Sequence, residues 1–305
     1  MRVRSIFVRE LINEFLGTFT LIVFGESIMA IIIAGRQEHN AGIIAPVGWG
    51  AAIFCAVTVS GGVSAHLNPA VTLALASVKK FPIKKVPLFF VAQYTGAFLG
   101  AAVVFAIYRD AIAAMDNGVR AVTGPTGTAP IFATYPREGI STLTCFIDQV
   151  VATGFLVLTA EAITDPRNFG GLPKPFYPLT LGFMITAEIF AFSYNCMAPL
   201  NPARDLGPRV FTAIAGYGTG VFSVRNYVWM FVPIFAPHVG GVLGAWTYKV
   251  CVEDNWPEEE NTVVLPVTTA AGAPVDSIVA REQMMYEKQQ QLQQPTMQAS
   301  QPLAR

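Results

Sequence analysis

Charged residues are scarce in this sequence. Of its 305 residues, 13% are charged and 53% are hydrophobic, and the mean hydropathy is +0.48. Soluble domains carry about 25% charged residues, so the composition excludes an ordinary soluble globular protein and indicates several membrane spans. Acidic and basic residues are equal in number, so the net charge of zero gives no sign of nucleic acid or of another strongly charged partner.

Cysteine and histidine are also rare. The four cysteines stand far apart, without a Cys-x-x-Cys pair, and the chain has three histidines. This spacing predicts isolated thiols and gives no disulfide framework or zinc site. The sequence also lacks a P-loop motif, a nucleophile–base set and an Asp/His relay through its apolar stretches. We therefore expect no enzyme activity, no cofactor and no bound metal.

Six stretches are long and apolar enough to cross a membrane as helices, which takes roughly 20 residues each. They are about Leu11–Ala34, Ile43–Ser60, Pro87–Tyr108, Leu143–Ile163, Pro178–Tyr194 and Tyr227–Val250. Lys and Arg gather before the first stretch and in the connections after the second and the fourth. By the positive-inside rule we expect a multi-pass plasma-membrane protein with both termini in the cytoplasm.

The regions around these stretches differ in composition. Residues 1–10 form a short N-terminal segment, and residues 11–250 form one membrane domain. Residues 251–305 are first acidic and then rich in Gln, which predicts a disordered cytoplasmic tail with a short helix near Arg281–Gln294. The loop 109–141 is rich in Gly, Pro and Thr, and its sequence leaves open a vestibule or a flexible loop.

The two halves of the membrane domain, about residues 11–108 and 143–250, resemble each other. Asn13–Ile28 aligns with Asp148–Ile163, Asn68-Pro69-Ala70 with Asn201-Pro202-Ala203, and Gly96-x-x-x-Gly100 with Gly240-x-x-x-Gly244. Three spans per half are an odd number, so the halves must be inverted relative to each other in the membrane. We expect the paired glycines to serve helix packing.

Each Asn-Pro-Ala motif begins an apolar stretch that is too short to span, about Pro69–Val78 and Pro202–Ile214. Asparagine is a preferred N-cap and proline is favoured at the first helical position, so each motif predicts the start of a re-entrant half-helix. The cap uses the carboxamide oxygen and leaves the NH2 group as a donor. Two such helices meeting at the membrane centre would present two donors and two positive helix ends, which oppose cations and protons.

These motifs resemble those of the major intrinsic protein family, the aquaporins. The resemblance rests on "SAHLNPAVTLA", "MAPLNPARDLGPR", "GTFTLIVFG" and "AQYTGAFLGAA" and covers about Glu10 to Val250. Asp205 and the pair Asp148-Gln149 resemble residues found in the glycerol-conducting branch of the family, the aquaglyceroporins. The resemblance implies an all-α membrane protein in the lipid bilayer, with six transmembrane helices, two re-entrant half-helices, an inverted repeat and a homotetrameric assembly.

The resemblance also implies roles for individual residues. The pore centre comprises the motif residues Asn68, Pro69, Ala70, Asn201, Pro202 and Ala203. The selectivity constriction comprises Trp49, Ile189, Ala198 and Arg204. Lumen-lining carbonyls belong to Ala65, His66, Met197, Ala198 and Pro199, and the pore loops are braced by Glu14 and Gln149. Trp49 is assigned by assuming that one residue is missing before His66, whereas ungapped counting selects Gly48.

Three acidic residues have no role in this scheme. Glu26 and Glu161 lie near the ends of their stretches and are expected at the membrane interface, and no role is assigned to Glu188.

We therefore expect a passive channel that conducts glycerol and water and excludes ions and protons. Urea and other small neutral solutes remain open as permeants. The alternatives are a water-selective aquaporin, a gradient-coupled secondary transporter and a structural junction protein. The intact Asn68, Asn201 and Arg204 argue against a closed pore.

Overall fold

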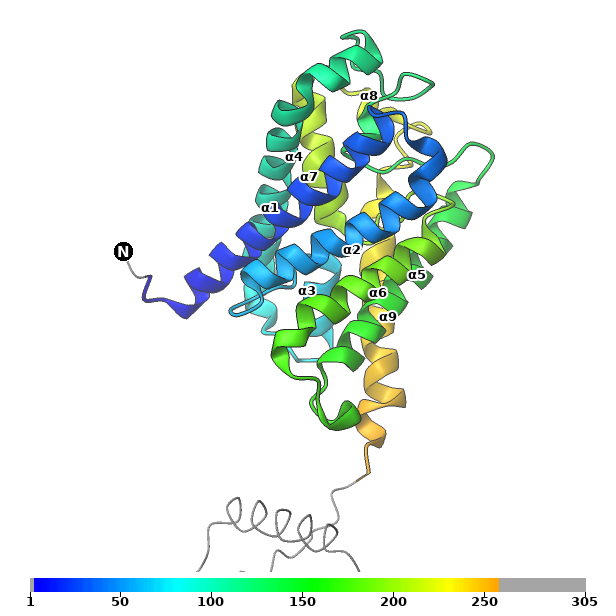
Figure 1. Cartoon of the computed structure of the whole chain (residues 1–305). Coiled ribbons are helices and arrows are strands. Elements are labelled where there is room, and N and C mark those ends of the chain that lie inside the picture. The colour runs from blue at the N-terminus through cyan, green and yellow to red at the C-terminus, as the bar shows by residue number, and fades with distance from the viewer. Residues whose placement is uncertain (1–2, 258–305) are drawn as a thin grey trace, which may run out of the picture. The chain divides into compact units, whose positions relative to one another are not determined.

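A computed structural model describes residues 3–257, which form helices joined by loops, without a strand. The long helices make a tilted bundle (Figure 1). They are α1 (Ile6–Ile33), α2 (Ala41–Ser60), α4 (Val86–Asp116), α5 (Thr142–Thr164), α6 (Tyr177–Phe192) and α9 (Phe231–Cys251). The all-α prediction is confirmed. The predicted tail helix near Arg281–Gln294 lies outside the described residues.

Five helical stretches are long and apolar enough to cross a membrane. They comprise α1 and α5, and α2, α4 and α6 each together with the short turn that precedes it. Helix α9 has 21 residues, which at 1.5 Å per residue reach roughly 31 Å, about the thickness of the hydrocarbon core. Its sequence includes Pro237, His238 and Lys249, which lower its hydropathy. The sixth span therefore stays a prediction.

Helix α4 runs eight residues beyond the predicted end at Tyr108. The added turns bury Ile112 and Met115 within the bundle. Part of the loop that follows is buried too, including Phe132 and Ala133. The sequence did not reveal either feature, because the contacts that bury these residues come from other parts of the fold.

Two short helices begin at the Asn-Pro-Ala motifs, as predicted. They are α3 (Pro69–Ser77) and α7 (Pro202–Thr212), with nine and 11 residues. At 1.5 Å per residue each covers roughly half of the hydrocarbon core. Figure 1 shows α7 in the half of the bundle nearer α8 (Gly220–Ser223), and α3 in the other half.

The helix contacts confirm the inverted repeat. Helix α1 packs on α4, and its counterpart α5 packs on α9. Each half-helix packs on the last long helix of the other repeat, so that α3 lies against α9 and α7 against α4. This exchange brings the two half-helices into contact with each other at the centre of the bundle.

The paired glycines lie where helices approach most closely. A Cβ atom on Gly96 would collide with the Phe15 carbonyl of α1, and one on Gly240 would collide with the Val150 carbonyl of α5. The structure therefore confirms their predicted packing role. Close approach of backbones is the usual means of helix association in lipid, where no hydrophobic effect separates helix from tail.

Replacing Gly240 with alanine tests this packing. The added methyl would overlap backbone rather than a flexible side chain, so we expect a loss of about 1–3 kcal/mol of stability despite alanine's better helix propensity. Gly62→Ala is the control, since a Cβ there meets nothing within 4 Å. Thermal unfolding in detergent should show a lower midpoint for Gly240→Ala alone, and equal midpoints would contradict the packing argument.

Candidate functional site: a passage between the half-helices

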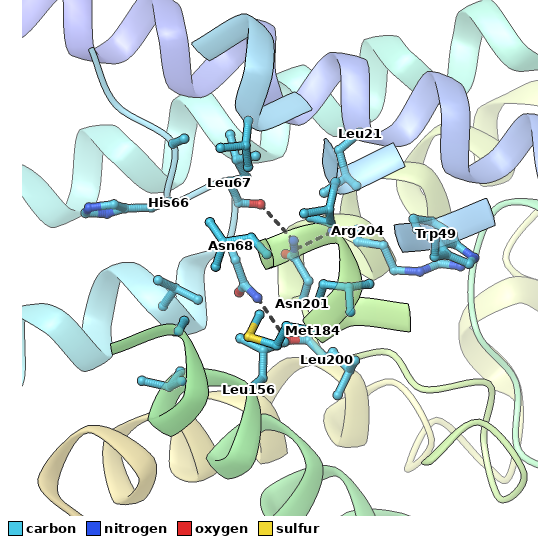
Figure 2. Close-up of a pocket in the computed structure, with 18 of the residues that line it drawn as sticks. Leu21, Trp49, His66, Leu67, Asn68, Leu156, Met184, Leu200, Asn201 and Arg204 are labelled. Carbon is cyan, nitrogen blue, oxygen red and sulfur yellow. Dashed lines mark hydrogen bonds between the residues drawn. The ribbon is translucent and has the colours of Figure 1, made fainter. Parts of the chain in front are cut away.

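The two motif asparagines hold the half-helices together by reciprocal hydrogen bonds. Asn68 Nδ2 donates to the Leu200 carbonyl at 3.0 Å, and Asn201 Nδ2 donates to the Leu67 carbonyl at 2.7 Å (Figure 2). Each side-chain oxygen caps its own helix, accepting from Ala70 N–H in α3 and from Ala203 N–H in α7. The predicted caps are confirmed.

Each NH2 group is only partly available to a solute. One N–H of each carboxamide is used by the opposite loop, and since an amide carries two, one remains. Both asparagines line the same cavity of about 230 Å³. The remaining N–H of each is therefore the donor available to a solute in this passage.

The passage consists of two cavities. The first, about 230 Å³, contains the asparagine pair and extends to His66 and Glu161. The second, about 470 Å³, is lined by residues of α1, α2, α6 and the loop 117–141, and we call it the vestibule. Of the sequence-predicted site residues, Trp49, Ile189 and Arg204 line both cavities. These three side chains therefore lie where the two cavities adjoin.

Three of the four residues predicted to form the constriction thus lie at this junction. The Arg204 guanidinium carbon lies 4.4 Å from the centre of the Trp49 ring, a cation–π contact. Ala198 lines the first cavity beside them. Gly48, which ungapped counting selects, lines neither cavity, and a Cβ there would collide with Ile28. The geometry supports Trp49. Figure 2 shows Trp49 and His66 on opposite sides of the asparagine pair.

The Arg204 side chain is positioned by a hydrogen bond to a backbone group that the sequence did not single out. Its Nη1 donates to the Phe132 carbonyl at 2.9 Å, from the loop that the sequence left open as vestibule or flexible loop. Burial of Phe132 fixes that carbonyl. The loop is thus part of the constriction's support and the wall of the vestibule.

Asp205 does not face the passage but supports the same loop. Its carboxylate forms an ion pair with Arg209 at 2.8 Å and accepts from the N–H and hydroxyl of Thr134 at 2.8 and 2.5 Å. Arg209 also donates to the carbonyls of Thr134 and Val221. All the charges of this pair are buried and hydrogen bonded, which is what makes burial tolerable. Asp205 is one of the residues on which the resemblance to the glycerol-conducting branch rests, and in this structure it supports the loop.

The predicted bracing residues lie behind the pore loops. Glu14 accepts four hydrogen bonds, from Ser64 Oγ at 2.5 Å, from the N–H groups of His66 and Leu67 at 2.7 and 2.8 Å, and from Gln93 Nε2 at 2.8 Å. A buried carboxylate is stable only when it is so satisfied. It thereby orders the loop that precedes Asn68.

Gln149 braces the second loop in the equivalent way. Its Oε1 accepts from Leu200 N–H at 3.0 Å, while its Nε2 donates to Asp148 at 2.7 Å. Asp148 in turn accepts from Asn195 Nδ2 at 3.1 Å. The first loop is therefore braced by the carboxylate of Glu14, and the second by the neutral amide of Gln149, which is hydrogen bonded to the carboxylate of Asp148. The two halves differ in this respect.

The braced loops have unusual backbone conformations. Leu67, Met197, Ala198 and Leu200 have φ between 46° and 64°, a left-handed region that non-glycine residues rarely adopt. Such strain persists where surrounding contacts fix it, and it is common in functional loops. Of the residues predicted to supply lumen carbonyls, Ala65, His66, Ala198 and Pro199 line the first cavity and Met197 lines the vestibule.

The membrane-interface positions expected for Glu26 and Glu161 stay a prediction, and both side chains are buried within the protein. Glu26 is fully buried in the bundle, where it interacts electrostatically with Arg204, and Glu161 is 4% exposed. Glu161 has its charged partner, Lys80, on another part of the chain, whereas neither carboxylate oxygen of Glu26 has a hydrogen-bond partner among the described residues. Glu188 is also buried.

Glu161 belongs to a charged cluster at the end of the passage opposite the vestibule. Lys80 Nζ lies 2.5 Å from Glu161 and 2.7 Å from Glu253. Burial disfavours the charged lysine, but its interactions with the accepting carboxylates of Glu161 and Glu253 outweigh this effect and raise the pKa of Lys80 above its ordinary value. The cluster ties α5 and the segment after α9 to the turn that follows α3.

Comparison with known proteins gives a consistent result. Residues 2–248 match the family described as Major intrinsic protein. Aquaporin-3 of Milnesium tardigradum is 44% identical over 81% of this chain and 78% of its own length. Aquaporin-9 of Homo sapiens is 40% identical over 85% of this chain and 87% of its own length.

A solved structure also resembles this fold. The X-ray structure of the aquaglyceroporin from Plasmodium falciparum superimposes with a TM-score of 0.70 at 33% identity. The match covers 81% of this chain and 98% of that one.

Glu14→Leu tests the bracing role. It leaves the N–H groups of His66 and Leu67 without their acceptor, and each hydrogen bond to a charged group is worth about 1.5–3 kcal/mol. We expect a lower thermal midpoint in detergent and a large loss of water permeability in vesicles. Glu10→Gln is the control, because Glu10 pairs with Lys85 away from the loop. A Glu14→Leu protein as stable and permeable as the control would show that the loop does not need its brace.

Proposed function

Because this chain belongs to the major intrinsic protein family, we propose that it is a passive channel for glycerol and water. The observation that carries this is the composition of the passage. Donors from Asn68, Asn201 and Arg204 face an otherwise largely apolar cavity that also contains the indole of Trp49. A polyol presents hydroxyl oxygens along one edge and C–H groups along the other, and the passage offers a partner to both.

The protein is a multi-pass membrane protein with a helical channel fold. We include in the proposal a plasma-membrane location, cytoplasmic termini, a homotetramer in the lipid bilayer and a channel domain of residues 11–250. The positive-inside pattern of Lys and Arg supports the orientation. Urea and other small neutral solutes are further candidate permeants. No enzyme activity is part of the proposal.

Exclusion of ions follows from the same geometry. The N-termini of α3 and α7 meet at the asparagine pair, and each carries a partial positive charge. Arg204 adds a full charge next to them. A cation or a proton in transit would have to pass these charges without its hydration shell, whereas a neutral polyol exchanges water hydrogen bonds for those of the wall.

A water-selective channel is the nearest alternative. The constriction side chains Trp49, Ile189, Ala198 and Arg204 contain no histidine, and Ala198 leaves one side of the ring open. Both features favour a polyol over water alone. The flux through a gradient-coupled transporter depends on an ion gradient, and a junction protein carries no flux. One vesicle experiment therefore distinguishes both from a passive channel.

Vesicles reconstituted with the full chain provide this experiment. We expect rapid shrinkage in a glycerol gradient, followed by reswelling as glycerol enters, with the same rate when the sodium and proton gradients are abolished. Light scattering measures both phases, and protein-free vesicles are the control. Shrinkage without recovery would identify a water-selective channel, and flux that needs an ion gradient would identify a transporter.

Variants of the constriction test the assigned residues. Trp49→Ala removes the apolar surface for the C–H groups, and Arg204→Ala removes a charged donor, whose loss is worth about tenfold. We expect each to change the ratio of glycerol to water permeability by about that factor. Phe24→Ala, on the exposed side of α1, is the control. If both variants keep the ratio of the unmodified protein, the constriction lies elsewhere.

A further inference from the structure

The vestibule is larger than the permeation of glycerol requires. Its volume is about 470 Å³, and a water molecule occupies about 30 Å³ of liquid. Trp49, Ile189 and Arg204 line it where it adjoins the first cavity, and Arg137 and Tyr194 are also part of its lining. A solute of several carbon atoms could rest here without entering the constriction.

Arg137 has hydrogen-bonding capacity that the protein does not use. Its backbone is fixed, since its N–H donates to the Asn195 carbonyl at 3.0 Å and its carbonyl accepts from Arg225 at 3.2 Å. Its guanidinium stacks on the Tyr194 ring at 4.1 Å. Within residues 3–257 that guanidinium makes no hydrogen bond or ion pair. Stacking on Tyr194 fixes the plane of the Arg137 guanidinium and leaves the N–H donors along its edge available to a ligand.

The charge of the vestibule has one sign. Its lining includes the guanidinium groups of Arg137 and Arg204 and no carboxylate from the described part of the chain. Glu138 follows Arg137 but does not line the cavity. Glu26 and Asp205 interact with Arg204 but belong to the buried bundle behind it. An anion in the vestibule therefore meets two guanidinium groups in the cavity lining and no carboxylate beside them among the residues that the structure describes.

We propose that the vestibule is a binding site for small hydroxylated organic anions, with the carboxylate on Arg137 and the hydroxyl groups toward Arg204 and Trp49. A guanidinium pairs with a carboxylate through two parallel hydrogen bonds, which gives both strength and orientation. Glycerate represents this class, because it is a three-carbon hydroxy acid that keeps two hydroxyls. The site does not depend on permeation, but its effect rests on the proposed function, since an occupied vestibule closes the route to the constriction.

Such an anion blocks rather than permeates. Beyond Arg204 the loops that contribute Ala198 and Pro199 line the cavity, and their backbone carbonyls are acceptors that offer a carboxylate no hydrogen bond. A neutral polyol donates to such groups and proceeds. The vestibule thus distinguishes a polyol from its own oxidised acid.

The test measures the osmotic water permeability of vesicles containing the full chain, at low ionic strength because salt screens exposed charges over about 8 Å at physiological concentration. Glycerate is added at neutral pH, with its uncharged amide as the matched probe. Arg137→Gln is compared with Arg36→Gln, which removes an exposed arginine near the same end of the bundle that does not line the vestibule. Permeability without additive reports that each variant is folded. Titration calorimetry of glycerate into the purified proteins measures binding directly.

We expect glycerate, and not its amide, to inhibit the unmodified protein and Arg36→Gln equally. In Arg137→Gln the half-inhibiting concentration and the dissociation constant should rise about tenfold, as expected for a charge-assisted pair. The site is refuted if glycerate neither binds nor inhibits, if the amide acts equally, or if Arg137→Gln responds like Arg36→Gln. Failure of the proposed function is distinct, because it appears as absent glycerol uptake without glycerate.

Discussion

The structure depends on one reciprocal pair of hydrogen bonds, from Asn68 to the Leu200 carbonyl and from Asn201 to the Leu67 carbonyl. Each half-helix begins in the interior, where an unpaired backbone or amide group is costly. The asparagines solve this for their own helix with the side-chain oxygen and for the opposite loop with one N–H. What is left over, one N–H per asparagine, is fixed in direction by the bonds already made. The donor that each asparagine offers to a solute is therefore the N–H that its structural hydrogen bonds leave unused.

The other features of the passage support that arrangement. Glu14 and Gln149 order the loops that carry the accepting carbonyls, so that four residues can keep a left-handed backbone. The Phe132 carbonyl holds Arg204, and the Asp205–Arg209 pair holds the loop on which Phe132 lies. Close glycine contacts bring α1 against α4 and α5 against α9, which sets the frame for both half-helices. These supports lie far from one another in sequence and converge on a few atoms.

Sequence reasoning recovered the parts of this account that local chemistry specifies. Asn-Pro at the start of a short apolar stretch, in matching places of two repeats, predicts a capped helix start. An odd number of spans per repeat requires inversion, so α3, α7 and their opposed placement could be inferred. Contacts between distant segments could not. The Phe132 carbonyl is a backbone atom without a motif, and the electrostatic interaction of Glu26 with Arg204 of α7 joins distant segments. The extension of α4 to Asp116 was missed because the surfaces that bury Ile112 and Met115 come from elsewhere in the fold.

The passage would select solutes twice. Arg137 in the vestibule selects by the charge of the solute, and the asparagine pair selects by its hydrogen-bonding groups. A polyol passes the asparagine pair by bonding to the N–H groups that the half-helices leave free. A high-resolution cryo-EM map of the full chain in glycerol would locate the solute. We expect elongated density in the passage, with oxygen positions within about 3 Å of Asn68 Nδ2 and Asn201 Nδ2. A passage closed by side chains at the asparagine pair, or glycerol density only outside the passage, would contradict it.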